Sequence, residues 1–207
     1  MRVLGYGEDA LTLWALAQRT NDILVQLGDK SETSDCTLLF RPSFGRSGGS
    51  KSSQFGEFDF ILATPYGLYL GEAKWDQSPE LIEDVIRLRK EQIERHKIFS
   101  AYYQVWISEE RWEWPSFLEA CQKRFSNLGI EKPLPPSDSL LSRNLRTILE
   151  LVTDATRRTS NVRNVLLVVD SRGILSKQGK KPPVGFDLIM VDSANERQGS
   201  FIPIKIG

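Results

Sequence analysis

Three ionisable side chains, Asp59, Glu72 and Lys74, lie in a stretch that otherwise has the composition of a buried β-hairpin. The stretch reads GEFDFILATPYGLYLGEAKW, residues 56–75, and most of its other positions are apolar or aromatic. An unpaired charge is costly to bury, because it loses its hydration without gaining a partner. These three residues therefore need partners, and they are the first candidates for chemistry.

The turn between the two expected strands determines which residues face each other. Thr64-Pro65-Tyr66-Gly67 has proline and glycine at the positions typical of a type I turn. A two-residue or a four-residue loop around it places Asp59 opposite Glu72, and Glu57 opposite Lys74. Opposed Cβ atoms lie roughly 4.5–5.5 Å apart. Two carboxylates so placed repel, and one of them binds a proton unless a cation lies between them.

A divalent cation with oxygen ligands would remove this repulsion. Lys74 follows Glu72 by two residues, so both side chains point to the same face of the strand. Its ammonium group could orient or deprotonate a water beside the ion, or neutralise charge that develops on a phosphate. Fixed carboxylates, a metal and a neighbouring lysine predict hydrolysis of a phosphodiester.

The elements expected around the hairpin indicate a single α/β domain over residues 1–207, a sandwich around a mixed central sheet. Trp112, Trp114 and Phe117 could stack on nucleic-acid bases, but they are rather expected to pack inside a helical insertion at about 109–160. Ser78 as N-cap and Pro79 at the first helical position predict the start of one long helix. The expected helices cover 8–27, 78–104 and 138–158, and the further strands cover 36–42, 164–170, 186–192 and 201–206.

Composition limits the class of protein. Of the 207 residues, 40% are hydrophobic and 26% charged, which is ordinary for a globular domain. The sequence has no apolar run long enough to cross a membrane and no secretory signal at its N-terminus. Its two cysteines, Cys36 and Cys121, indicate a reducing compartment, and we expect a cytoplasmic protein.

The net charge is zero, but the charge is unevenly distributed. Residues 140–185 hold nine basic and three acidic side chains, a local net charge of +6 that could hold nucleic-acid phosphates or form a solvated flank. The Gly/Ser-rich segment 43–56 could close over DNA or be a plain surface loop. The candidate DNA-binding residues are Arg46 and Lys51 in that segment, and Arg157, Arg158, Lys180 and Lys181 in the basic region.

FD at 58–59, followed thirteen residues later by EAK at 72–74, resembles the motif of the PD-(D/E)XK nuclease superfamily, which includes many restriction endonucleases and archaeal Holliday-junction resolvases. The resemblance covers residues 1–104 and the 164–170 strand, and implies a restriction-endonuclease-like α/β/α sandwich. It assigns Asp59 and Glu72 as metal ligands, helped by the Ala73 carbonyl, and Lys74 as the catalytic lysine. Phe58 stands where the motif has its proline.

The resemblance adds two candidates. Glu8, on the first helix, matches an acid that many members place near the metal, although an acid is also favoured at any helix N-terminus. Gln92, on the second helix, matches a polar side chain directed at the scissile phosphate, although a structural glutamine is an equal alternative. The only histidine, His96, is expected to pack on its helix rather than to catalyse.

The implied activity is that of a Mg²⁺-dependent endonuclease, with Mn²⁺ as an alternative metal. It would cut double-stranded or branched DNA, as a homodimer, in restriction, defence or repair. The alternative is a catalytically inactive nucleic-acid- or protein-binding module on the same fold, in which Asp59, Glu72 and Lys74 form an internal ion pair. An RNase is a weaker third interpretation. Metal binding distinguishes the nuclease from the binding module, since an internal ion pair needs no metal.

Overall fold

The computed structural model describes residues 2–44, 56–81, 84–131, 134–173 and 180–205, and the account that follows concerns these residues. Their α-helices are α1 (Gly7–Gln18), α2 (Thr20–Leu27), α3 (Lys90–Trp106), α4 (Trp114–Leu128) and α5 (Leu140–Thr156). Their strands are β1 (Arg2–Gly5), β2 (Thr37–Phe40), β3 (Phe60–Thr64), β4 (Gly67–Trp75), β5 (Val162–Asp170), β6 (Phe186–Asp192) and β7 (Ile202–Lys205). None of these helices is long and apolar enough to span a bilayer.

The central sheet has five strands in the order β2-β3-β4-β5-β6. The β2–β3 and β3–β4 pairs are antiparallel, whereas the β4–β5 and β5–β6 pairs are parallel, so the sheet is mixed as predicted. The apolar segment 164–170 lies within β5, between β4 and β6, which confirms the predicted interior strand. A separate antiparallel pair is formed by β7 and by β1, a strand that the sequence did not predict.

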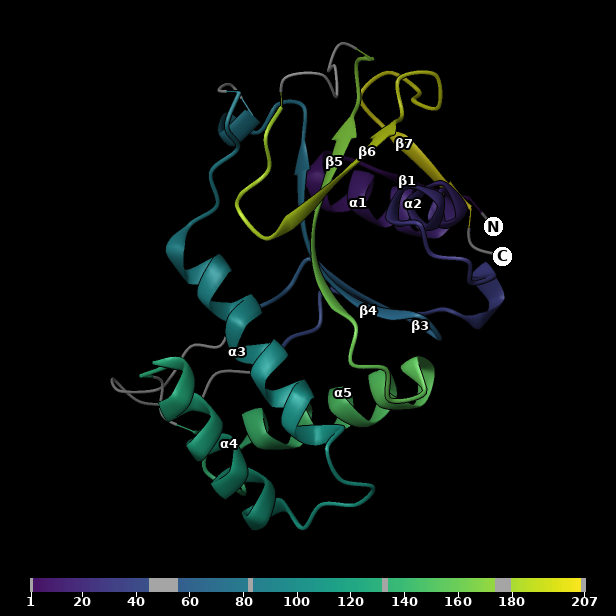
Figure 1. Ribbon diagram of the computed structural model, residues 1–207. Helices are drawn as coiled ribbons and strands as arrows, with labels where there is room; N and C mark the ends of the chain where they lie inside the picture. The colour runs from purple at the N-terminus through teal and green to yellow at the C-terminus, as the bar shows by residue number, and fades with distance from the viewer. Residues whose placement is uncertain (1, 45–55, 82–83, 132–133, 174–179, 206–207) are drawn as a thin grey trace.

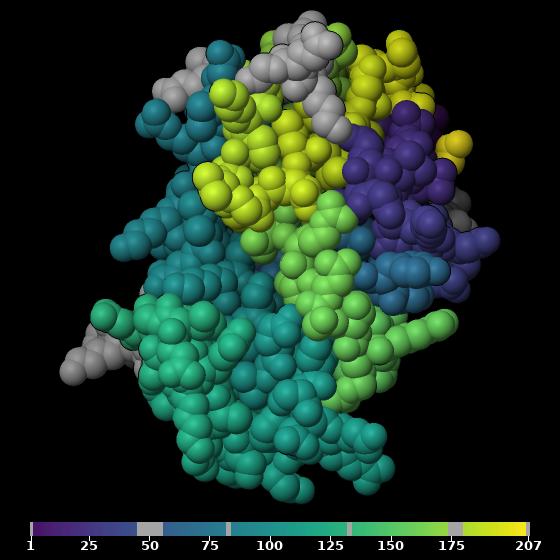
Figure 2. Space-filling view, in the orientation of Figure 1, coloured from purple at the N-terminus to yellow at the C-terminus, as the bar shows by residue number. Residues whose placement is uncertain are grey.

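Helices cover both faces of the sheet (Figure 1). On one face, α1 and α2 pack on a core that includes Trp14, Ile23 and Tyr69. On the other, α3 and α5 cover Leu68 and Leu70, and α4 packs against α3. In the space-filling view, α4 and α5 form the lower part of the molecule, and the N- and C-terminal elements lie in the upper part (Figure 2).

Alternation along β4 then determines the faces of the polar residues. Leu68, Leu70, Glu72 and Lys74 have the same parity, so they belong to the face that α3 covers. The hairpin register is the predicted one, from Phe60 opposite Gly71 to Thr64 opposite Gly67. The two-residue version of the loop is the one formed.

Two predicted helices are wrong in extent. The helix expected over 8–27 is divided at Arg19, whose ψ of 19° departs from helical geometry, although Gly28 ends α2 in the left-handed region as expected. The helix expected over 78–104 begins only at Lys90, after a 3₁₀ turn at Pro79–Leu81. Leu81, Val85 and Leu88 therefore precede α3.

A tertiary contact explains the late start of α3. The amide of Ile86 donates to the carbonyl of Lys181, and the amide of Lys181 donates to the carbonyl of Asp84. The backbone before α3 thus pairs in a strand-like way with a segment nearly a hundred residues later. These hydrogen bonds replace those that a helix would make, and local start signals cannot reveal them.

The segment predicted as a helical insertion, 109–160, is mainly helical in its described part. It contains α4 and α5, and the serine hydroxyl of Ser139 accepts a hydrogen bond from the Ser142 amide at 3.1 Å to begin α5. Trp112 and Trp114 both contact the ring of buried Phe117, with centroids 5.9 and 5.0 Å away. These aromatic residues pack inside the insertion, as expected.

Gly71 gives a first prediction, because a Cβ at this position would lie 2.1 Å from ring atoms of Phe60 on the paired strand. We expect Gly71→Ala to lower the free energy of unfolding by about 3 kcal/mol or more, as overpacking a rigid core does. Chemical denaturation measures this loss. The double variant Gly71→Ala/Phe60→Leu should recover part of it, and wild-type stability in Gly71→Ala would contradict the contact.

Candidate functional site

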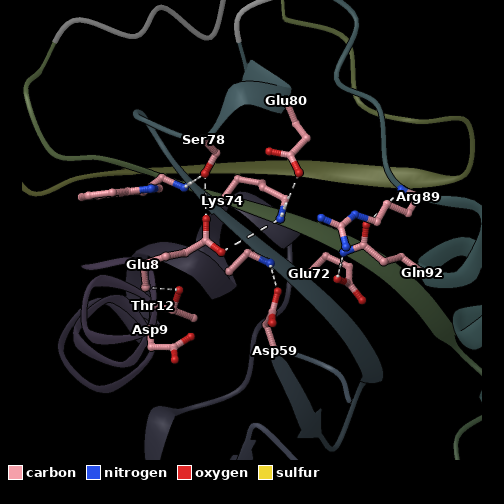
Figure 3. A network of polar contacts seen from close by, with 12 residues as sticks. Glu8, Asp9, Thr12, Asp59, Glu72, Lys74, Ser78, Glu80, Arg89 and Gln92 are labelled. Carbon is pink, nitrogen blue, oxygen red and sulfur yellow. Dashed lines mark hydrogen bonds and ion pairs between the residues drawn. The ribbon is translucent and has the colours of Figure 1, made fainter. Parts of the chain in front are cut away.

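The candidate site lies at the C-terminal end of β4, where residues from both layers meet (Figure 3). Asp59 immediately precedes β3, and two hydrogen bonds fix it beside β4. Its amide donates to the Gly71 carbonyl at 3.2 Å, and its Oδ2 accepts from the Ala73 amide at 2.7 Å. These bonds flank Glu72, so the predicted apposition of Asp59 and Glu72 is confirmed.

Glu72 is 1% exposed, and its carboxylate is held by three side chains of α3. Oε1 accepts from Arg95 Nη2 at 2.5 Å and hydrogen-bonds His96 Nε2 at 3.2 Å. Oε2 accepts from Gln92 Nε2 at 2.5 Å. Burial alone would raise the pKa of Glu72, but the His96 hydrogen bond and the Arg95 charge outweigh it and lower the pKa. Glu72 therefore stays ionised.

The three residues on α3 share a function in holding Glu72, and the sequence pointed only to Gln92. Gln92 itself is oriented by the Arg89 amide, which donates to its Oε1 at 3.0 Å. His96 is buried and also hydrogen-bonds Asn164 Oδ1, so its predicted packing role is extended by a polar one. The spacing of Gln92, Arg95 and His96 places them on one helix face, a signal that could have found Arg95.

Asp59 is the least compensated charge of the site. Burial raises the pKa of Asp59 to about 6, and the negative charges of Glu72 and Glu8 add to this effect. The Ala73 amide and the Lys74 charge act in the opposite direction without cancelling it. Among the described residues, Ala73 is the only hydrogen-bond donor to its carboxylate. The site thus has excess negative charge at Asp59.

Lys74 lies between two acids rather than opposite Glu57. Its Nζ is 4.0 Å from Glu8 Oε1 and 3.9 Å from Glu80 Oε1, and its side chain is 11% exposed. Glu57 instead accepts from Arg41 at 3.2 Å, so the predicted facing of Glu57 and Lys74 is wrong. The pairing of β3 ends at Phe60, which leaves Glu57 outside the ladder. Sequence reasoning missed Glu80 because it was expected on a long helix.

Glu8 occupies the first turn of α1 and reaches the site. Its Oε2 accepts from Ser78 Oγ at 2.7 Å, and Ser78 Oγ in turn accepts from the Trp75 amide at 3.1 Å. Ser78 was expected as a helix N-cap, but its hydroxyl bonds β4 and α1 instead. Glu8 thereby links α1 to the end of β4, and its other oxygen faces Lys74.

The carboxylates of the site are candidate ligands for a divalent cation. In the described part of the chain, no three His, Cys, Asp or Glu side chains are grouped closely enough to hold a metal. Mg²⁺, however, commonly keeps several waters and takes one or two carboxylates together with substrate phosphate. Two carboxylates of the site fit such an ion. Asp59 carries excess negative charge, and Oε2 of Glu72 has Gln92 as its one hydrogen-bond partner among the residues that the structure describes.

Comparisons of the chain with models of protein families, with curated proteins and with solved structures found no match. The resemblance to the PD-(D/E)XK superfamily therefore rests on Asp59, Glu72 and Lys74 and on their places at the end of one hairpin. It remains a prediction, together with the activity that it implies.

The predicted DNA-binding arginines lie at the wrong end of the sheet for this site. Arg157 and Arg158 follow α5, and the strand after them begins with Val162 beside Leu68. Leu68 lies roughly 20 Å along β4 from Lys74. Arg158 also donates to the carbonyl of Ile107 at 3.0 Å, so it closes the end of α3.

The predicted lysines are placed differently. Lys180 Nζ donates to the Leu81 carbonyl at 2.8 Å, and Lys181 forms a β-bridge with Val85. Both therefore adjoin the segment that follows Glu80, on the side of the site. Arg46 and Lys51 lie outside the described residues.

Proposed function

We propose that this chain is a Mg²⁺-dependent endonuclease that hydrolyses DNA phosphodiester bonds, on a restriction-endonuclease-like variant of the α/β sandwich. The observation that carries the proposal is the placement of Asp59 beside Glu72 at the end of β4, with a pKa raised to about 6 and Lys74 on the same strand face. A buried pair of acids with one uncompensated charge is suited to a divalent cation.

The residues of the site would have different roles in cleavage. Asp59 and Glu72 would hold Mg²⁺, with Mn²⁺ as an alternative, and the Ala73 carbonyl is the third candidate ligand. A bound divalent ion activates water as a nucleophile and stabilises negative charge on phosphate. Lys74 orients the attacking water or neutralises the phosphate. Its ion pairs with Glu8 and Glu80 keep its ammonium at the site.

The three α3 residues act through Glu72. Arg95 and His96 keep its carboxylate ionised, and Gln92 holds its second oxygen, Oε2, which would be available to a bound ion. Gln92 is also the residue that could contact the scissile phosphate, since it is partly exposed and hydrogen-bonds Glu72. The structural interpretation of Gln92 stays open beside this one.

A homodimer is the proposed assembly for cleavage of a duplex. Two copies related by a two-fold axis match the symmetry of duplex DNA and bring one site to each strand. Branched DNA would be cut under the same chemistry. A role in restriction, defence or repair follows only from the proposed family.

One observation favours a second candidate function, a non-catalytic binding module. Glu72 is already paired with Arg95, and Lys74 already lies near two acids. An internal network of this kind needs no metal. Asp59 is the residue that the network leaves uncompensated, so its behaviour decides between the two candidates.

Incubation with supercoiled plasmid tests the nuclease proposal. In Mg²⁺ the wild type should nick or linearise the plasmid, EDTA should stop the reaction, and Lys74→Met should slow it roughly 100-fold or more. Lys123→Met is the matched control, because Lys123 is 74% exposed and distant in the chain from the hairpin, and it should keep full activity.

The proposal would be overturned if wild type left plasmid, single-stranded DNA and branched DNA all uncleaved, both in Mg²⁺ and in Mn²⁺. Equal cleavage by wild type and Lys74→Met would place the activity elsewhere.

A further inference from the structure

An exposed aromatic cluster adjoins the candidate site. It consists of Tyr6, Trp75 and Phe201, and the Tyr6 and Phe201 side chains are 64% and 48% exposed. The Tyr6 ring lies 6.5 Å from the Trp75 ring and 6.2 Å from the Phe201 ring, both edge-on. Trp75 is only partly exposed and packs on the core beneath α1 and α2. The open ring surface of the cluster therefore belongs to Tyr6 and Phe201.

Tyr6 follows β1 and Phe201 precedes β7, so both lie at the end of the strand pair where Gly5 is opposite Ile202. The inward residues Ile202 and Ile204 are buried in the core, so the alternate residues face outward. Leu4, 49% exposed, is opposite Pro203 on that outer face. The outer face thus continues the apolar surface away from the cluster.

Two basic residues lie directly opposite each other at the far end of this face. Arg2 pairs with Lys205 in the register, and both are exposed. Like charges directly opposed across a strand pair repel. The described part of the chain supplies neither of them with an acidic partner. Such a pair is suited to an anion that bridges it.

Residues of the cluster are close in sequence to residues of the site and are linked to them by hydrogen bonds. Tyr6 precedes Glu8 by two residues, and Trp75 directly follows Lys74. The Trp75 amide bonds Ser78, whose hydroxyl bonds Glu8. A ligand that lies on the aromatic cluster therefore contacts Trp75, the last residue of β4, on the strand face opposite Lys74.

We propose that the aromatic cluster binds the bases of an unpaired DNA strand, while Arg2 and Lys205 bind its phosphates. Aromatic rings stack on single-stranded bases, whereas the base faces in a duplex are covered by their neighbours. The substrate would then be DNA with a single-stranded segment beside the cleaved bond. This inference rests on the proposed nuclease function, which leaves the structure of the DNA open.

A second copy of the chain is the competing occupant. In the described residues β1 and β7 form a two-stranded sheet, so each has one edge that could pair with another strand. The opposed basic pair argues against it, since a two-fold contact across this face would bring further positive charges together. Charge complementarity favours the nucleic acid.

Binding is measured in EDTA, so that no cleavage is needed. The anisotropy of a labelled oligothymidylate, compared with a blunt duplex of equal length, reports the affinity of each. We expect wild type to prefer the single strand, and Tyr6→Ala/Phe201→Ala to bind it roughly tenfold more weakly or worse. Tyr6→Phe keeps the ring and should bind like wild type. Tyr66→Ala is the matched control, because Tyr66 is 57% exposed at the opposite end of β4.

The basic pair gives an independent variant that leaves the aromatic rings in place. Arg2→Ser/Lys205→Ser should make the dependence of log affinity on log salt less steep by roughly 1.4, the value for two lost phosphate contacts to a single strand. An unchanged slope would overturn the assignment of these two residues.

Equal affinity of wild type for single strand and duplex, or wild-type binding by the aromatic double variant, would overturn the proposal. A double variant that changes from dimer to monomer in sedimentation while its DNA affinity is unchanged would assign the face to a second copy instead. Failure of the nuclease function is a different result, the absence of Mg²⁺-dependent cleavage, and it leaves these binding ratios measurable.

Discussion

Asp59→Asn is expected to make the metal-free protein more stable at neutral pH while abolishing cleavage. The pKa of Asp59 is raised to about 6 by burial and by Glu72, so ionising it in the folded state is costly. Removing that charge should raise the free energy of unfolding by roughly 2–3 kcal/mol. For a domain of this size the melting temperature rises by roughly 5–10 °C.

Proton binding determines whether Asp59 raises or lowers the free energy of unfolding as the pH changes. The ordinary pKa of 3.8 describes Asp59 in the unfolded chain, and about 6 describes it in the folded one. Between these values the folded state binds more protons, so Asp59 lowers stability as pH rises through this window. The gain from Asp59→Asn should therefore be absent below about pH 4 and complete above about pH 7.

Thermal melts of wild type and Asp59→Asn across this pH range, in EDTA, measure the difference. Mg²⁺ should stabilise the wild type and leave the variant unaffected, because binding to the folded state alone shifts the equilibrium. A variant less stable than wild type at neutral pH in EDTA would contradict an uncompensated charge at Asp59.

Arg95→Met is expected to cause a large loss of stability. Glu72 is 1% exposed, and the variant removes the guanidinium that donates to its Oε1 at 2.5 Å. Leaving a buried charge without its partner costs about 3–5 kcal/mol. His96 and Gln92 remain in contact with Glu72, so the lower end of this range applies.

The contribution of Glu72 to stability changes with pH in the opposite direction to that of Asp59. The pKa of Glu72 is lowered below its ordinary 4.5, so its paired charge stabilises the protein above that pH and loses this effect as pH falls further. Arg95→Met should therefore differ most from wild type near neutral pH. Denaturant unfolding at several pH values measures the difference.

Two further variants control this experiment. Arg146→Met removes a half-exposed partner of Glu150 and should cost less than about 1 kcal/mol. Arg95→Met/Glu72→Gln should recover most of the lost stability, because the unpaired charge is gone. If Arg95→Met were no more costly than Arg146→Met, Arg95 would not compensate Glu72.

The core of the site could be predicted from sequence because its determinants are local. The turn at Pro65 and Gly67 sets the hairpin register, and alternation then puts Asp59 beside Glu72. The interior position of β5 is likewise predicted by its nearly continuous apolar sequence.

The rest depends on contacts between distant segments. Ser78 and Pro79 form a local start signal for a helix, but pairing with Lys181 displaces the start of α3 to Lys90. β1 is short and mostly exposed, and it forms only because β7, some two hundred residues later, supplies its partner. The positions of basic residues in the sequence likewise did not predict that Arg158 would donate hydrogen bonds to the carbonyls of Trp106 and Ile107 at the C-terminal end of α3.

A calorimetric titration of Mn²⁺ tests the central claim, that a divalent cation joins Asp59 and Glu72, most directly. Wild type and Asp59→Asn are titrated in the same chelator-free buffer at neutral pH. We predict saturable, near-equimolar binding to wild type and at least roughly tenfold weaker binding to Asp59→Asn, since a carboxylate ligand is lost. Absence of saturable binding to wild type, or equal binding to both proteins, would contradict the claim.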